Sequence, residues 1–180
     1  MLKRIIPFAH SIIEDYIRKD DSVIDATCGN GHDTLFLATL ANHVYSYDIQ
    51  ASAIESTTLL LNKHQINNVT LINESHESFH SVTINPKVIM YNLGYLPGSD
   101  KTVTTTHSTT ISSIKNGLEI LEVNGLISIT VYTGHTEGLK EDKEITTFVQ
   151  SLSSKFFNVI LYKAVNKANS PYNIFIEKIR

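Results

Sequence analysis

Residues 25–34 read DATCGNGHDT, with Gly29 and Gly31 two positions apart. A short apolar run at residues 22–26 precedes the two glycines, and a helical pattern at residues 33–41 follows them. Glycines at a strand-to-helix junction permit a tight turn and let a ligand approach the backbone closely. Ligands of doubly wound sheets lie just beyond the carboxyl ends of the strands. This stretch therefore predicts an α/β fold with a ligand site after its first strand.

The residues around the two glycines restrict the chemistry of that ligand. A dinucleotide fingerprint requires a third small residue at position 34, where Thr34 stands, and the acid Asp33 is unfavourable beside a pyrophosphate. A P-loop is excluded because the chain has no Gly-Lys-Ser/Thr. Asp25 and Asp33 instead place negative charge on both sides of the turn. This pattern favours a ligand with a cationic side, a ribose and no phosphate, and S-adenosylmethionine has this chemistry.

A second anchor for such a ligand is Asp48, which lies 17 residues after Gly31 and closes a predicted strand at residues 44–47. An acid at the end of a second strand can accept both hydroxyls of a ribose. Ile49 and Gln50 would flank the adenosine, and Ser75 and His76, after a third strand, stand where an adenine edge could be contacted. The alternatives are a purely structural turn and a helix N-cap at Asp48. The predicted cofactor-binding residues are Asp25, Cys28, Gly29, Asn30, Gly31, His32, Asp33, Thr34, Asp48, Ile49, Gln50, Ser75, His76 and Asn92.

The rest of the chain continues the alternation of strands and helices. Helical patterns occupy residues 8–17, 51–65, 108–121 and 139–152, and β-rich runs occupy residues 69–72, 88–91 and 125–132. Two final β-rich runs, 156–162 and 172–178, are joined by a short connection without a helical pattern, which predicts an antiparallel hairpin. We therefore expect a Rossmann-like, mostly parallel seven-stranded sheet with helices on both faces, in a single domain spanning residues 1–180.

Composition limits the class of protein and its partners. The 180 residues are 42% hydrophobic and 18% charged, an ordinary globular profile, and one cysteine, Cys28, excludes an intramolecular disulfide and a multi-cysteine zinc site. No metal site is expected, because His-Glu-x-x-His is also absent. Without a signal sequence or an apolar run of about 18 residues, we expect a cytoplasmic protein. The net charge of −3 excludes a generally basic surface but leaves room for a basic patch, for which the candidates are Lys3, Arg4, Lys101, Lys163 and Lys167.

Residues 25–34 resemble motif I of class I methyltransferases. More narrowly, the chain resembles the "putative rRNA-methylase" family of small bacterial proteins, which includes the MnmM-type tRNA 5-aminomethyluridine methyltransferases. The resemblance extends to four further segments, residues 75–77, 92–101, 131–135 and 169–171. Residues 92–101 are its most specific part. Two departures stand near the acceptor side: Thr136-Glu137-Gly138 replaces the family's paired glycines, and Ser170 replaces a proline.

The resemblance implies an enzyme that transfers a methyl group from S-adenosylmethionine to an RNA amine. The implied acceptor is the exocyclic amine of 5-aminomethyl-(2-thio)uridine at the tRNA wobble position, in the anticodon stem-loop. Alternatives are an rRNA or small-molecule methyltransferase of the same fold and a non-catalytic Rossmann-like binding module. A homodimer is the commonest assembly and is also expected.

Four residues are candidates for the catalytic side: Asn92, Tyr95, Tyr132 and His135. Residues 92–95 occupy the place of the Asp/Asn-Pro-Pro-aromatic motif of amine-directed methyltransferases, without its prolines. There the Asn92 amide could accept a hydrogen bond from the amine, and Tyr95 could stack on the base. Tyr132 and His135 stand at the end of the fifth strand. His76 and His107 are further candidate proton acceptors, and Lys101, Lys163 and Lys167 are the predicted RNA contacts.

Overall fold

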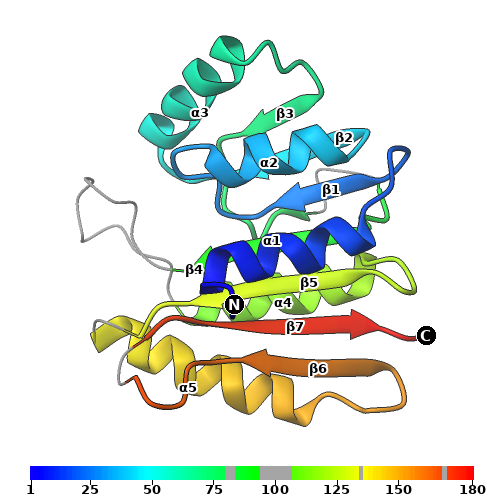
Figure 1. Cartoon of the computed structure of the whole chain (residues 1–180), viewed down its shortest axis with the longest axis vertical. Helices are drawn as coiled ribbons and strands as arrows, with labels where there is room; N and C mark the ends of the chain where they lie inside the picture. Colours follow the sequence, from blue (N-terminus) through cyan, green and yellow to red (C-terminus); the bar gives the residue numbers. More distant parts are fainter. Residues whose placement is uncertain (80–83, 94–106, 134–135, 168–169) are drawn as a thin grey trace.

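A computed structural model describes residues 1–79, 84–93, 107–133, 136–167 and 170–180 of the chain, with the backbone alone at 107–108 and 136–141 (Figure 1). Its centre is one seven-stranded sheet with strand order β3-β2-β1-β4-β5-β7-β6. The first five strands run parallel, and β7 is antiparallel to both β5 and β6. This confirms the predicted mostly parallel sheet with an antiparallel C-terminal hairpin. The strands are β1 Ser22–Asp25, β2 His43–Tyr47, β3 Val69–Ile72, β4 Val88–Leu93, β5 Leu126–Val131, β6 Phe157–Tyr162 and β7 Tyr172–Lys178.

Five helices cover the two faces of the sheet. The helices α1 and α2 pack on one face through residues such as Ile13 and Leu37. On the other face, α4 and α5 pack through Ile114, Leu118 and Ile145. The helix α3 lies against α2 and β3. The central strands β4 and β5 are buried on both faces, which explains their nearly continuous apolar sequences. The bounds are α1 Ile5–Tyr16, α2 His32–Leu40, α3 Ala51–Lys63, α4 His107–Ile120 and α5 Thr136–Ser151.

Several boundaries differ from the sequence prediction for physical reasons. The helix α1 begins at Ile5 rather than at residue 8, because Pro7 lies in its first turn, where a missing N–H group costs nothing. The helix α3 ends at Lys63 rather than at residue 65, and Gln65 has a φ of 56°, which an α-helix does not accommodate. The strand β4 extends to Leu93 and thereby includes Asn92. No helix among the described residues is long and apolar enough to cross a membrane.

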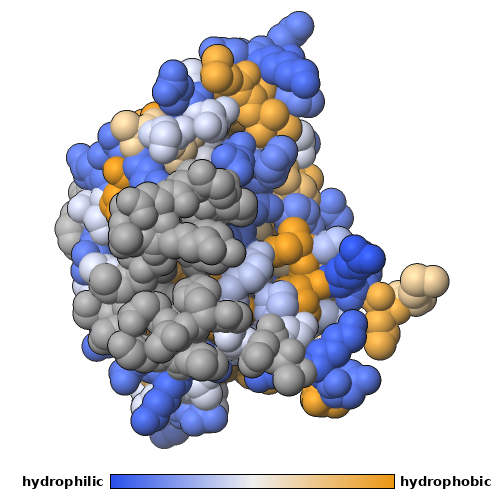
Figure 2. Space-filling model, turned by 90° about the vertical axis from the view of Figure 1, so that its left-hand side faces the viewer, coloured by the Kyte–Doolittle hydropathy of each residue, from blue (hydrophilic) through white to orange (hydrophobic). Residues whose placement is uncertain are grey.

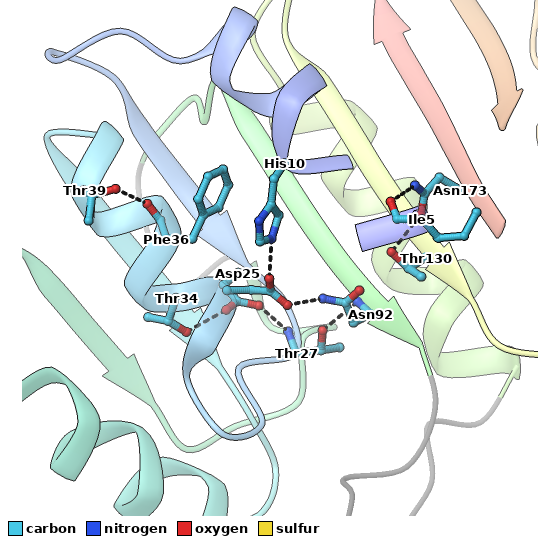
Figure 3. Close-up of polar contacts among 11 residues, drawn as sticks. Ile5, His10, Asp25, Thr27, Thr34, Phe36, Thr39, Asn92, Thr130 and Asn173 are labelled. Atoms are coloured by element: carbon cyan, nitrogen blue, oxygen red, sulfur yellow. Dashed lines mark hydrogen bonds and ion pairs between the residues drawn. The ribbon is translucent and has the colours of Figure 1, made fainter. Parts of the chain in front are cut away.

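The start of α1 is tied to the C-terminal hairpin. The Asn173 side chain donates a hydrogen bond to the Ile5 carbonyl at 2.7 Å and accepts one from Thr130 at 3.0 Å (Figure 3). The Tyr162 hydroxyl donates to the Lys3 carbonyl at 2.8 Å, and its ring stacks on Phe8 with centroids 3.7 Å apart. These contacts fix the position of α1 over the middle of the sheet.

The strand order places a topological switch point between β1 and β4. The chain leaves β1 towards α2 on one face and returns after β4 to α4 on the other face. Ligands of open α/β sheets bind in the crevice at such a point, outside the carboxyl ends of the strands. Residues 26–31 and the end of β4 both lie there.

Candidate functional site

The glycine turn between β1 and α2 is held in a shape that needs its glycines. Gly29 and Gly31 have φ values of 53° and 82°, in the left-handed region. A Cβ atom at Gly31 would lie 2.8 Å from the Thr57 hydroxyl oxygen and 3.0 Å from the Thr57 Cα, so α3 packs directly against the turn. Thr57 also donates a hydrogen bond to the Gly29 carbonyl at 3.2 Å. The turn is therefore a close-packed structure rather than an open loop.

Cys28 lies inside this turn and is buried. Its backbone N–H donates to the Tyr47 carbonyl at 2.9 Å, which links the turn to β2. Burial, and secondarily the charge of Asp25, raises the pKa of the Cys28 thiol to about 12. A thiol with this pKa is protonated at neutral pH, which fits a small packing residue and argues against a nucleophile.

Asp25 supports the turn from inside the fold. Its side chain is completely buried, and its two oxygens accept hydrogen bonds from the Thr34 hydroxyl at 2.6 Å and the Thr27 N–H at 3.1 Å. Thr34 is also within hydrogen-bond distance of Ser46 on β2, at 2.8 Å. Burial, and secondarily the charge of Asp33, raises the pKa of Asp25 to about 7. The acid thus joins β1, β2 and α2 beneath the turn.

Asp48 at the end of β2 organises the turn from the side. Its carboxylate accepts the Gly29 N–H at 3.0 Å through one oxygen and the Gln50 N–H at 2.9 Å through the other. The N-cap of α3 is Gln50, so the alternative of Asp48 as that N-cap is wrong. Each carboxylate oxygen keeps a second acceptor position, so the predicted contact with ribose hydroxyls stays open. Beside it, Ile49 is 53% exposed and offers an apolar surface.

Asn92 lies near the end of β4 and bonds across the switch point to residues that follow β1. Its backbone N–H donates to the Thr27 hydroxyl at 2.8 Å, and its side-chain Nδ2 donates to Asp33 Oδ2 at 2.6 Å. Its side-chain Oδ1 is buried and has no hydrogen-bond partner among the described residues. A buried amide oxygen without a partner is costly, so a ligand N–H at this position would satisfy it.

His10 is a residue of this site that sequence analysis missed. It projects from α1 towards the ends of β1 and β4 (Figure 3), and its Nε2 lies 2.6 Å from Asp33 Oδ1. The imidazole ring stacks on Phe36 of α2, with centroids 3.8 Å apart and planes 8° apart. No spacing in the sequence could have indicated this contact, because only the sheet order brings α1 beside α2. Thr27 and Thr57 were missed for a similar reason, because each meets its partner from a distant segment only in the folded chain.

Of the two predicted residues after β3, His76 lies against β4 and α4, where its carbonyl accepts a hydrogen bond from the Ser113 hydroxyl at 2.9 Å. His76 is buried, and its ring meets Tyr91 edge-on at a centroid distance of 5.9 Å. Burial lowers the pKa of His76 to about 4, so the imidazole is neutral and a poor proton acceptor at neutral pH. Its Nδ1 has no partner among the described residues, which keeps the predicted cofactor contact open. Ser75 accepts the Glu77 N–H at 3.3 Å and shapes the local turn.

The remaining predicted residues lie at the periphery or outside the described parts. Tyr132 follows β5 and is 37% exposed. Burial, and secondarily the charge of Asp33, raises the pKa of the Tyr132 hydroxyl. Asn30, His32, Lys163 and Lys167 are exposed. Tyr95, Lys101, His135 and the side chain of His107 lie outside the described residues.

The charges around the turn fit a ligand with a cationic centre. Asp33 and Asp48 lie around it, while the buried Asp25 supports it from beneath, and among the described residues the short contact from His10 to Asp33 is the only one that a basic side chain makes with these acids. Asp33 in the first turn of α2 opposes a phosphate at that helix end. Figure 2 shows the end of the molecule where the parallel strands finish, and its described surface is mostly hydrophilic with separate hydrophobic patches. The turn, the acids and the unpartnered Asn92 oxygen therefore suit S-adenosylmethionine better than a nucleotide phosphate.

Comparison with known proteins gives a consistent set of relatives. A model of the family described as "Putative rRNA methylase" matches residues 44–178. The chain is 35% identical to the chloroplastic tRNA (mnm(5)s(2)U34)-methyltransferase of Arabidopsis thaliana, over 98% of this chain and 70% of the relative.

Solved structures agree with these sequence matches. A "putative rRNA-methylase" from Clostridium thermocellum superposes with a TM-score of 0.97 at 35% identity, covering 99% of this chain and 100% of its own. A "putative methyltransferase" from Streptococcus mutans, solved in complex with SAH, has a TM-score of 0.93 at 39% identity and covers 99% of both chains.

Proposed function

The chain belongs to the "Putative rRNA methylase" family, and from this premise we propose that it methylates the exocyclic amine of 5-aminomethyl-(2-thio)uridine at the wobble position of a tRNA. It is an S-adenosylmethionine-dependent methyltransferase, and the acceptor is what we propose. The relative from Arabidopsis thaliana is named for position U34 of a tRNA. Its match extends along nearly the whole chain, which supports a shared acceptor.

The observation that carries the proposal is the buried Oδ1 of Asn92. An amine acceptor brings an N–H group that such an oxygen can bind, whereas an acceptor carbon brings no donor of its own. The Asn92 N–H bond to Thr27 and the Asn92 amide bond to Asp33 hold this oxygen at the switch point, next to the glycine turn. The glycine turn holds the cofactor, so acceptor and donor meet between β1 and β4.

The side chains around Asn92 can assist the reaction of an amine. Bound S-adenosylmethionine would supply an activated methyl group, whose bond to sulfur breaks as its bond to nitrogen forms, and the acceptor nitrogen must be neutral to attack it. Burial of the amine favours this neutral form, since an alkyl amine in water has a pKa of about 10.4. The Asp33 carboxylate then stabilises the positive charge that develops on the nitrogen as its new bond to carbon forms. Asn92 Oδ1 orients the amine, and Tyr132 borders the acceptor side.

Exposed basic residues from both ends of the chain lie near one another at the end of β6. The Tyr162 bond to the Lys3 carbonyl brings the segment that carries Lys3 and Arg4 to the end of β6, which Lys163 follows directly. The Lys163 ammonium lies 4.7 Å from the centroid of the Tyr172 ring. The β6–β7 connection is at the same end of the sheet as the glycine turn (Figure 1). We propose that this basic group contacts the phosphates of the anticodon stem-loop.

The test is methyl transfer to tRNA that carries 5-aminomethyl-(2-thio)uridine, followed by mass spectrometry of the released nucleosides. We expect 5-methylaminomethyl-(2-thio)uridine to form with the wild-type chain and to fall strongly with Asn92→Ala. Ribosomal RNA and tRNA lacking the aminomethyl group serve as competing substrates. Methylation of either one in place of the aminomethyl tRNA would contradict the proposal.

RNA contact is tested separately by charge reversal. The double variant Lys163→Glu, Lys167→Glu should weaken tRNA binding and lower its salt dependence, because fewer counterions are released on binding. The control is Lys155→Glu, an exposed lysine before β6 at the opposite end of the sheet. Equal effects of both charge changes would mean that the basic group is not the RNA contact.

A further inference from the structure

We propose that His10 and Asp33 are positioning residues that fix the Asn92 amide with its oxygen facing the acceptor amine. This inference rests on the proposed function, since it concerns how the same site orients its substrate. It adds a residue of α1, His10, that stands far from the glycine turn in sequence.

The orientation of the Asn92 amide follows from what Asp33 can do. An ionised carboxylate accepts hydrogen bonds and donates none. The Asn92 atom at 2.6 Å from Asp33 Oδ2 must therefore be the amide nitrogen, and the amide oxygen must face the other way. Were Asp33 absent, the amide could turn over and present N–H groups to an amine that itself has N–H groups to donate. The Asp33 carboxylate thus keeps the amide oxygen of Asn92, which accepts hydrogen bonds, turned towards the substrate amine.

His10 holds the carboxylate in the position that makes this selection. The second oxygen of Asp33 lies 2.6 Å from His10 Nε2, so that nitrogen must carry a proton and donate it. Each Asp33 oxygen then accepts one short hydrogen bond, and the carboxylate plane is fixed between α1 and β4. The His10 ring cannot swing away freely, because it is stacked on Phe36 and α1 is tied to Asn173 and Tyr162.

Two substitutions separate the hydrogen bond of His10 from its packing. His10→Phe keeps an aromatic ring for stacking on Phe36 and removes the N–H donor. His10→Gln removes the ring and keeps an amide N–H of similar reach. His43→Phe is the matched control, because His43 lies at the start of β2, at the opposite end of that strand from Asp48, and its ring nitrogen lies 2.8 Å from the Thr70 hydroxyl.

The first readout is steady-state methyl transfer to the aminomethyl tRNA. We expect His10→Phe to lower kcat about 10- to 100-fold, the range for losing one hydrogen bond to a charged group, with KM for tRNA and the affinity for S-adenosylmethionine nearly unchanged. His10→Gln should recover most of the loss, and His43→Phe should match the wild type. Wild-type kcat in His10→Phe, or a loss in His10→Gln as large as in His10→Phe, would overturn the inference.

The second readout is nuclear magnetic resonance of the free protein and does not depend on activity. The His10 ring nitrogens should show a proton on Nε2, and the Asn92 side-chain amide signal should shift in His10→Phe and in Asp33→Asn but not in His43→Phe. A His10 ring protonated on Nδ1 alone, or an Asn92 signal indifferent to His10→Phe, would overturn the inference even if the wild-type protein methylated another acceptor. If the wild type were inactive on aminomethyl tRNA but showed the Nε2 proton of His10 and the shifts of the Asn92 amide signal in the variants, the proposed acceptor would be refuted. The positioning roles of His10 and Asp33 would still be supported.

Discussion

Replacing Asp25 by asparagine should make the protein's stability less sensitive to pH. The Asp25 carboxyl is completely buried, and its pKa is about 7 in the folded chain against 3.8 for the unperturbed group. The folded state therefore binds this proton more tightly than the unfolded state. As pH rises from about 4 to about 7, the unfolded chain ionises first and stability is lost, and above about pH 7 the loss stays constant. At 1.36 kcal/mol per pKa unit, the whole difference is on the order of 4 kcal/mol.

Asparagine can take the place of the protonated acid with little change in shape. Its Oδ1 can accept the Thr27 N–H, and its Nδ2 can donate to the Thr34 hydroxyl, which still reaches Ser46. Urea unfolding at several pH values between about 5 and 8 gives the free energy of unfolding of both proteins. We expect Asp25→Asn to gain stability relative to the wild type as pH rises, by a few kcal/mol over this range.

A matched control is Asp20→Asn, because Asp20 is exposed and the same atoms change there. This variant measures the effect of removing one exposed carboxylate, and the change with Asp25→Asn should exceed it. If the curve for Asp25→Asn ran parallel to the wild type, the pKa of Asp25 would be the same in the folded and unfolded chains; if the variant lost relative stability at higher pH, folding would lower that pKa. The argument that burial dominates the charge state beneath the turn would then be wrong.

Three further substitutions test other parts of the structure. Gly31→Ala should lower the free energy of unfolding, measured in urea, by roughly 2–4 kcal/mol, because Gly31 has a left-handed φ and an added Cβ would collide with Thr57. Adding Thr57→Ala should restore only part of this loss. Asp48→Ala should weaken S-adenosylmethionine binding, measured by calorimetry, about tenfold or more, because the glycine turn loses its support and the ribose loses its contacts. Wild-type affinity in this variant would mean that Asp48 does not belong to the cofactor site. Lys178→Met should lower the free energy of unfolding by about 1–2 kcal/mol, because the Lys178 ammonium donates hydrogen bonds to carbonyls at the C-terminal end of α4. An unchanged urea midpoint would show that water satisfies these carbonyls equally well when the ammonium is absent.

Local pattern was enough to predict the elements of the fold and part of the site. The apolar runs of β4 and β5 and the connection between β6 and β7 predicted the parallel sheet and its closing hairpin. The acid–glycine sequence of residues 25–34 and the spacing to Asp48 located the turn that the structure places at the switch point. These features depend on residues near one another in the chain, where periodicity and turn chemistry apply.

Contacts between distant segments could not be predicted in the same way. His10 and Asp33 are 23 residues apart, and Asp33 and Asn92 are 59 apart, so each pair meets only after the strand order is fixed. The sequence also could not tell that Asp25 faces inward while Asp48 holds the backbone of Gly29. Which way an acid points depends on the packing of its neighbours, and that information lies in the whole fold.

The tether between the beginning and the end of the chain has a consequence for folding during synthesis. The helix that carries His10 is translated before the sheet, yet the partners that hold its start, Tyr162 and Asn173, lie 159 and 168 residues after the Lys3 and Ile5 carbonyls that they bind. The packing of α1 against β5 and the stacking of His10 on Phe36 can form earlier, but the contacts that hold the start of α1 must wait for β6 and β7. The start of α1 is therefore secured only once β6 and β7 have been made, so translation products truncated before them lack the contacts that hold this end of α1 over the sheet.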